Sequence, residues 1–210
     1  MKTIHSAIPL LLLLVLAPCA LCQGHIKDSN HEAYGKKCPA LHSADPATLL
    51  QYLNDNKPTP QNAICVTWAI YGVGDARYEP AIPALVNLLD FARQIITGTW
   101  DHLPGSAYPA VEALEDIGRP SLPALLATMK APAASPTAQT NALEAWLIIY
   151  RTSDRQSHGF AALRREANAT TDDSVKKRLE DILQYGLKHW CQDGTPGAKC
   201  RQAAQDGIDR

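Results

Sequence analysis

The stretch that decides the fold is residues 66–89, V-T-W-A-I-Y-G-V-G-D-A-R-Y-E-P-A-I-P-A-L-V-N-L-L. Its apolar positions follow a helical spacing that starts just before it: Ile64, Trp68 and Tyr71. This spacing predicts a helix over about 61–71. We expect Gly72 or Gly74 to end that helix, because glycine readily takes the left-handed conformation found after a last helical turn. A second helix is expected to begin at Pro80, where a missing backbone N–H costs nothing.

A second copy of this pattern follows further along the chain. Pro80-Ala-Ile-Pro83-Ala-Leu85 recurs as Pro120-Ser-Leu-Pro123-Ala-Leu125, and Phe160-Ala-Ala-Leu163 forms a weaker third copy. Pro-x-x-Pro is also the pattern of polyproline ligands, but the apolar helical stripe after each copy favours a helix start. Repeats of about 40 residues built from paired helices are typical of an α-solenoid, in which each hairpin buries its apolar face against its neighbours.

These motifs resemble HEAT repeats, and in particular the short HEAT-like repeats first named from phycobilin lyases. The resemblance rests on an Ala/Leu-rich helix, a Gly-Asp-x-Arg turn that Asp75 and Arg77 match, and an x-Pro-Ala-Leu start of the partner helix. The second copy has Gly118-Arg119 without the aspartate, and the third has Ser153-Asp154-Arg155 without glycine or proline. The resemblance covers about residues 61–168 and implies a scaffold more than a particular activity.

The rest of the chain shows helical periodicity and no convincing strand pattern, so an all-α fold is expected. Residues 45–190 are expected to form an α-solenoid of about three to four HEAT-like helical hairpins. The expected helices cover about 45–53, 61–71, 80–95, 107–117, 120–129, 137–150, 155–168 and 172–190. Asp45-Pro46 and Thr171-Asp172-Asp173 supply two of the starts. Residues 23–44 are expected to form an irregular arm, and residues 191–210 a C-terminal tail.

Residues 1–22 are typical of a signal peptide. Lys2 precedes an apolar run over residues 10–17, which is far shorter than the roughly 20 residues of a membrane-spanning helix. Ala20-Leu21-Cys22 places small residues before a cut at Gln23. Leu16-Ala17-Pro18-Cys19 loosely resembles a lipoprotein signal, although proline before the cysteine fits poorly. We therefore expect a secreted or periplasmic protein, with a lipoprotein as the alternative.

Charge and cysteine content indicate which partners and which redox compartment to expect for the mature chain. Without residues 1–22, 19 basic and 21 acidic side chains remain, which gives no reason to expect nucleic acid or an anionic membrane as partner. Four cysteines remain, and an even count in an exported chain predicts disulfides. We favour Cys38–Cys65 and Cys191–Cys200 among the three pairings, because each closes a short loop. The alternative for Cys191 and Cys200 is metal binding with His189.

No catalytic set stands out in the sequence. Ser157-His158 and Asp101-His102 are neighbours along the chain, which does not by itself bring a nucleophile, a base and an orienting group together. The candidate recognition residues are Trp100, Asp101 and His102, in the one inter-repeat loop expected to be extended. The alternative is that Trp100 folds back and caps the core.

These observations favour an exported, non-catalytic scaffolding module without a cofactor, which binds a protein or peptide on the concave face of the solenoid. The family resemblance implies an alternative, a lyase-like attachment factor for a bilin. Such factors act beside cytoplasmic light-harvesting proteins, whereas this chain carries an expected signal peptide. A third hypothesis is a small metal-binding exported domain that uses His25, His31 and the cysteines.

Overall fold

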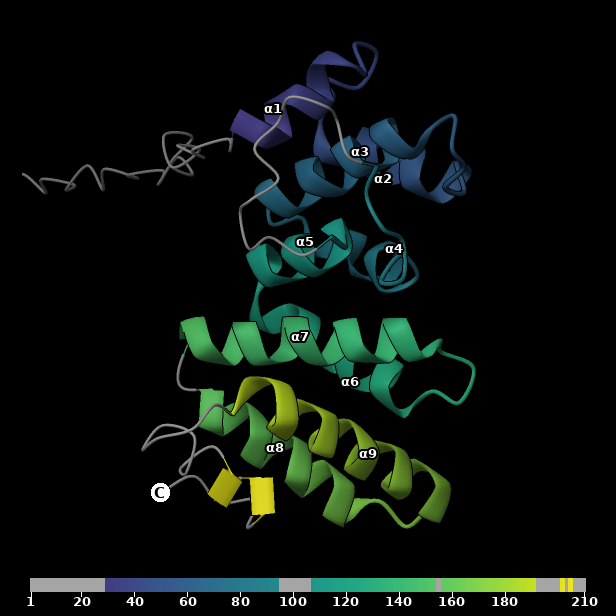
Figure 1. Ribbon diagram of the computed structural model, residues 1–210. Coiled ribbons are helices and arrows are strands. Elements are labelled where there is room, and N and C mark those ends of the chain that lie inside the picture. The colour runs from purple at the N-terminus through teal and green to yellow at the C-terminus, as the bar shows by residue number, and fades with distance from the viewer. Residues whose placement is uncertain (1–28, 95–106, 154–155, 192–200, 203, 206–210) are drawn as a thin grey trace, which may run out of the picture.

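The computed structural model describes residues 29–94, 107–153, 156–191, 201–202 and 204–205 (Figure 1). Within these residues the regular structure is entirely helical, which confirms the all-α class. The helices are α1 (Ser29–Lys36), α2 (Pro46–Asp55), α3 (Ala63–Asp75), α4 (Ile82–Val86), α5 (Pro109–Ile117), α6 (Leu122–Lys130), α7 (Pro136–Ser153), α8 (Gln156–Ala169) and α9 (Asp173–Trp190). None of the described helices is both long enough and apolar enough to cross a membrane.

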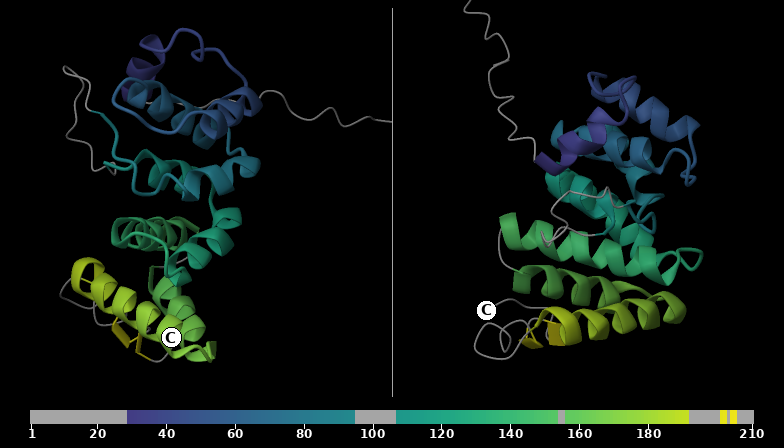
Figure 2. Two further views of the ribbon diagram at one scale, coloured as in Figure 1. Left: turned by 90° about the vertical axis from the view of Figure 1, so that its right-hand side faces the viewer. Right: turned by 45° about the horizontal axis from the view of Figure 1, so that its top comes forward.

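The helices pack as two adjoining columns. In one column α3 packs on α5, α5 on α7 and α7 on α8, and in the other α2 packs on α4, α4 on α6 and α6 on α9. Helices of the two columns also pair, so that α2 lies against α3, α4 against α5, α6 against α7 and α9 against α8. Figures 1 and 2 show these pairs as successive layers from one end of the molecule to the other. The buried side chains of all layers form one continuous apolar core.

The repeated Pro-x-x-Pro motifs are helix starts. A short 3₁₀-helix, Glu79–Ala81, leads into α4, and another, Arg119–Ser121, leads into α6 at the equivalent place in the second copy of the motif. The first proline of each motif lies in the 3₁₀-helix and the second lies in the first turn of the α-helix. Proline fits both positions because their N–H groups have no partner within the helix.

The helix expected over 80–95 is much shorter in the structure. α4 ends at Val86, and turns follow through Asp90. The backbone carbonyl of Leu89 accepts a hydrogen bond of 2.6 Å from the Asn141 side chain of α7, instead of a bond from a following helical turn. A buried carbonyl needs such a partner, so the contact between layers holds this segment in the turn conformation.

The expected role of Gly72 and Gly74 is wrong. α3 continues to Asp75, and the left-handed residue after it is Arg77, with a φ of 49°. A Cβ on Gly74 would lie 2.7 Å from Cα of Ala113, so this glycine lets α3 and α5 cross at close range. Gly118 has a φ of 81° and does end α5, as its sequence position indicates.

The arm expected to be irregular contains α1, so that expectation is wrong for residues 29–36. Tyr34 is only 1% exposed, and the chain after α1 is tied to α3 by the Cys38–Cys65 disulfide, which confirms the predicted pairing. The sequence of α1 shows no apolar stripe, so α1 is held by tertiary contacts and not by an amphipathic face. Cys191 is buried, but Cys200 lies outside the described residues and their pairing stays a prediction. The expected signal peptide over 1–22 also lies outside them.

Candidate functional site

The expected recognition residues Trp100, Asp101 and His102 lie outside the described part of the chain, as does His25. The structure does describe where that segment leaves and rejoins the fold. The backbone N–H of Arg93 donates to the carbonyl of Ala107 at 2.9 Å. The hydroxyl of Tyr34, on α1, donates to the carbonyl of Gln94 at 2.9 Å. Both ends of the segment are therefore fixed beside α1 and α5.

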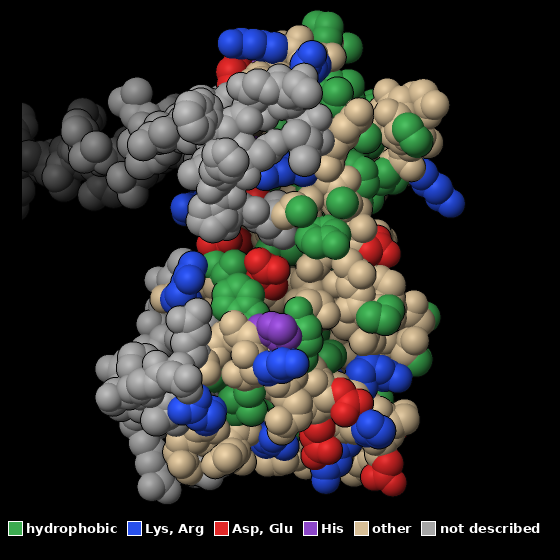
Figure 3. All heavy atoms as spheres, viewed as in Figure 1, with side chains coloured by type: hydrophobic (Ala, Val, Ile, Leu, Met, Phe, Trp, Pro, Cys, Tyr) green, Lys and Arg blue, Asp and Glu red, His purple; other side chains and the backbone are tan. Residues whose placement is uncertain are grey.

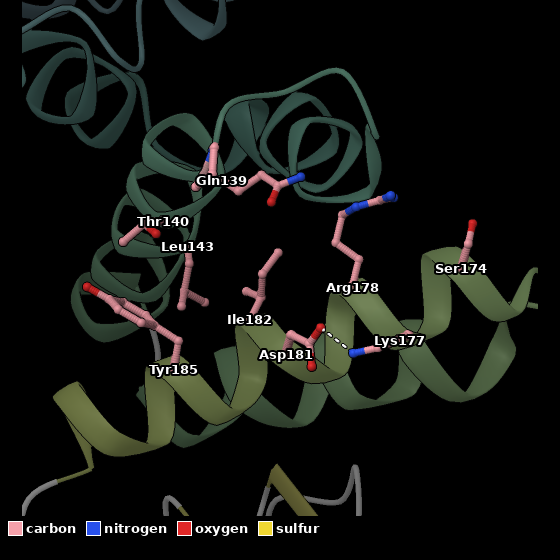
Figure 4. Close-up of a pocket in the computed structure, with 10 residues that line it drawn as sticks. Gln139, Thr140, Leu143, Ser174, Lys177, Arg178, Asp181, Ile182 and Tyr185 are labelled. Atoms are coloured by element: carbon pink, nitrogen blue, oxygen red, sulfur yellow. Dashed lines mark hydrogen bonds and ion pairs between the residues drawn. The ribbon is translucent and has the colours of Figure 1, made fainter.

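A groove of about 430 Å³ lies between α7 and α9, near the opposite end of the molecule (Figure 4). From α7 it is lined by Pro136, Gln139, Thr140 and Leu143, and from α9 by Ser174, Lys177, Arg178, Asp181, Ile182 and Tyr185. Its size falls within the usual range of small-molecule pockets, roughly 300–1,000 Å³. We call it the α7–α9 groove.

The α7–α9 groove has an apolar floor and a polar rim. Leu143 and Ile182 are buried at its floor, whereas Tyr185 is 42% exposed, the one large hydrophobic side chain among the described residues that is so exposed. At the rim, Nζ of Lys177 lies 2.9 Å from Asp181 Oδ2, and Arg178 donates to the backbone carbonyl of Lys130 at 2.7 Å. Over α9, basic and acidic side chains are interspersed (Figure 3). This arrangement suits a ligand that presents both an apolar group and polar or charged groups.

A second feature, at the other end of the fold, is a largely enclosed histidine between two carboxylates. His31 of α1 places Nδ1 3.5 Å from Asp75 Oδ1 of α3 and Nε2 3.7 Å from Glu112 Oε2 of α5. Its ring stacks on Tyr71 of α3, with 3.7 Å between ring centroids and 13° between the planes. We call His31, Tyr71, Asp75 and Glu112 the His31 cluster. It joins three helices that are distant in sequence.

The charge of His31 follows from these neighbours. Burial disfavours an imidazolium and lowers its pKa, but Asp75 and Glu112 outweigh this effect and raise the pKa of His31 to about 9. The side chain is 12% exposed, so the attraction is little screened by water. His31 is therefore a cation at neutral pH and neutralises part of the charge of its two carboxylate partners.

The hydrogen bonding of the cluster is incomplete. Three buried atoms in this part of the described chain have no hydrogen-bond partner: Nδ1 of His31, Oδ2 of Asp75 and Oε1 of Glu112. The two His31 distances are longer than ordinary hydrogen bonds. The hydroxyl of Tyr71 is better satisfied, since Arg93 donates to it at 2.8 Å.

Acidic side chains continue from the cluster along α5 and onto α7. Burial, together with the nearby charge of Asp116, raises the pKa of Glu115 to about 7. Burial and the charge of Glu112 raise the pKa of Glu144 on α7. The negative charge of α5 thus exceeds what His31 compensates.

The chemistry available to the His31 cluster is limited. Both ring nitrogens of His31 face carboxylates, and the one hydroxyl of the cluster, on Tyr71, accepts a hydrogen bond from Arg93. Across the described residues, no group of three or more histidine, cysteine or acidic side chains is arranged to hold a metal ion. His31 is thus held in partly buried ion pairs, and not in the flexible arm that the metal-binding hypothesis assumed. The geometry is that of a clamp between helices.

Sequence reasoning missed both features for different reasons. The members of the His31 cluster lie on three helices, and no local spacing connects them. The α7–α9 groove had one usable signal: Tyr185 falls off the apolar stripe of α9, which consists of Val175, Leu179, Ile182, Leu183 and Leu187. An aromatic side chain away from the buried stripe of a helix indicates an exposed contact residue.

Comparison with known proteins adds no assignment: no protein-family model, no curated protein and no solved structure matches this chain. The geometry of the two features is therefore the basis for a functional proposal.

Proposed function

We propose that this protein is an exported, non-catalytic binding module, an α-solenoid of HEAT-like hairpins that holds an extended peptide segment of another protein in the α7–α9 groove. The observation that carries the proposal is the groove itself, with its buried aliphatic floor, polar rim and exposed Tyr185. Tyrosine at the edge of a concave surface supplies a large contact area at low entropic cost, and such residues dominate many protein interfaces.

The repeat architecture supports the solenoid part of the proposal. The two helix columns stack pair on pair, and the 3₁₀-to-α start of α4 recurs at α6. Stacked hairpins of this kind present extended surfaces for partners. The Cys38–Cys65 disulfide supports export, because disulfides persist in oxidising compartments and are rare in the cytosol.

The lining residues define the chemistry of the peptide. An aliphatic side chain fits against Leu143 and Ile182, and Tyr185 covers it from the rim. Lys177 is 75% exposed and its ion pair with Asp181 lies on the surface, so its ammonium is available to a carboxylate of the ligand at little cost. We therefore expect a segment with an aliphatic residue close to an acidic one. The described residues offer no comparable observation in favour of a bilin or a metal ion.

Selection from a random peptide library displayed on phage tests this proposal with the purified mature protein. We expect enriched sequences to share an aliphatic–acidic pattern and to lose about tenfold or more in affinity to a Tyr185→Ala variant. Lys188→Ala is the matched control, since Lys188 is exposed on the same helix but does not line the groove. Enrichment of no peptide, or of peptides that bind Tyr185→Ala as tightly as the natural protein, would contradict it.

A further inference from the structure

α1 lies at one end of the helical stack, where it covers α3 (Figures 1 and 2). The contact is close, because a Cβ on Gly35 would come within 3.0 Å of two ring atoms of Trp68. Tyr34 adds a ring contact to Tyr71, with centroids 5.8 Å apart. The terminal layer of a stack has no further neighbour to bury its apolar face, so a capping element is needed there. α1 occupies that position.

Besides the Tyr34–Gln94 hydrogen bond and the Glu32–His42 pair, two contacts of different chemistry fix the two ends of α1. His31, in its first turn, is paired with Asp75 and Glu112. Cys38, just after its last residue, is bonded to Cys65 of α3. The first contact depends on charge and the second on oxidation state. Each fixes a different end of the same short helix.

We propose that α1 is a releasable cap held by two independent locks, the His31 clamp at its start and the Cys38–Cys65 bond after its end, and that it leaves the stack only when both are open. With one lock closed, one end of the helix stays attached and closing the loop again costs little entropy. With both open, a helix of this length without an amphipathic stripe is marginal by itself. Release exposes the Trp68 and Tyr71 side of α3 together with two unpaired carboxylates.

The charge lock opens when His31 loses its proton. The groups that face it are Asp75 and Tyr71 of α3 and Glu112 of α5, with Asp116 also near and Arg93 bound to the Tyr71 hydroxyl. A neutral ring leaves two partly buried carboxylates without a counter-charge, which is unfavourable. The folded-state pKa of about 9 lies above the ordinary value of 6.5, so the lock is closed below pH 6.5 and opens as the pH rises through 9.

The redox lock opens by thiol–disulfide exchange. A dithiol reductant transfers two electrons and two protons, Cys38 and Cys65 become thiols, and the reductant becomes its own disulfide. This step is independent of the charge of His31. An exported protein would therefore keep its cap in an oxidising environment even under alkaline conditions.

Hydrogen exchange measured by mass spectrometry tests the two locks in four states of the full mature protein: oxidised or reduced with dithiothreitol, each at pH 6.5 and pH 9.5. Rates are corrected for base catalysis, and peptides from α9 report whether the rest of the molecule stays folded. We expect protection of residues 29–37 to fall at least tenfold only in the reduced protein at pH 9.5. The reduced His31→Gln variant should lose the protection of residues 29–37 at pH 6.5 already. The reduced Glu112→Gln variant should lose part of that protection at the same pH.

His42→Gln is the matched control, because His42 pairs with Glu32 at 2.9 Å on the same segment but is far more exposed. It should behave as the natural protein does. Equal protection of residues 29–37 at both pH values in the reduced protein would overturn the proposal. So would complete loss on reduction alone at pH 6.5, or a His42→Gln variant that matches His31→Gln.

Discussion

The two ends of this molecule use charge in opposite ways. In the layers of α1, α3 and α5, a histidine and two carboxylates meet inside the fold, where His31 is 12% exposed. In the layers of α7 and α9, Lys177 and Asp181 meet at the rim of an open groove, 75% and 66% exposed. Removing one partner costs roughly 3–5 kcal/mol where the pair is enclosed, because the other charge is left uncompensated, and a fraction of one kcal/mol at the surface. Burial, and not the kind of residue, separates a region that holds the fold together from one available to a partner.

We expect substitutions at the α1–α3–α5 end to change stability and to leave peptide binding intact. We expect substitutions in the α7–α9 groove to weaken peptide binding and to leave stability unchanged. The largest effect is expected for His31→Gln. At pH 6 it should lower the free energy of unfolding by about 3 kcal/mol, because two partly buried carboxylates lose their counter-charge. At pH 9.5 the loss should shrink below about 1 kcal/mol, since His31 of the natural protein is then mostly neutral.

Urea unfolding followed by circular dichroism at both pH values measures this difference. His42→Gln again serves as the control and should cost less than about 0.5 kcal/mol at either pH, because the His42 side chain is 39% exposed and its pair with Glu32 is screened by water. A loss of equal size at pH 6 and pH 9.5 would show that His31 contributes packing on Tyr71 and not charge.

Gly74→Ala comes next and tests the crossing of α3 and α5 without touching a charge. The added methyl group would meet the backbone of Ala113, which cannot rotate away, so we expect a loss of about 2 kcal/mol. Gly72→Ala is the matched control. Its methyl group would meet Cδ1 of Leu49, the far end of a flexible side chain, and alanine gains helix propensity of about 1 kcal/mol over glycine. In thermal unfolding, the midpoint of Gly74→Ala should lie clearly below that of Gly72→Ala. Equal midpoints would refute the close crossing of α3 and α5.

Local features of the fold were readable from the sequence. Asp45 and Asp172 cap α2 and α9 through their side chains, as expected from an acidic residue before a helix. The prolines at 80 and 120 mark equivalent helix starts. These signals are local, because caps and prolines act within one turn of the backbone.

Long-range features were not readable. His31, Asp75 and Glu112 lie far apart along the chain, and only the packing of three helices brings them together. Gly74 looks like a helix end in sequence, yet its role depends on Ala113 of another helix. The α7–α9 groove likewise needs two helices. The sequence position of Tyr185 indicates that this side chain is exposed, but it does not indicate the apolar floor that α7 contributes.

Lys177→Ala sharpens the groove side of the comparison. Its ion pair with Asp181 is an exposed contact one helical turn apart, worth roughly 0.3–0.5 kcal/mol, so stability should hardly change. Affinity for a selected acidic peptide should fall about three- to tenfold, and the dependence of affinity on salt should weaken. Calorimetric titration at two salt concentrations measures both quantities. Unchanged affinity, with Lys188→Ala also neutral, would remove Lys177 from the recognition surface.

The smallest effect is expected where the acidic side chains of α5 approach α7, between the two regions. Burial and Asp116 raise the pKa of Glu115 to about 7, above the ordinary 4.5. The unfolded chain therefore loses this proton at lower pH than the folded chain does, and the folded state loses stability as the pH rises from 4.5 to 7. Glu115→Gln should remove that loss and stabilise the protein by less than about 1 kcal/mol above pH 7, with no gain at pH 4.5. Denaturant midpoints at the two pH values give the sign directly. A loss at pH 7.5 would mean that Arg151 or another cation compensates Glu115 fully, and an equal gain at both pH values would mean that the charge of Glu115 is not the cause.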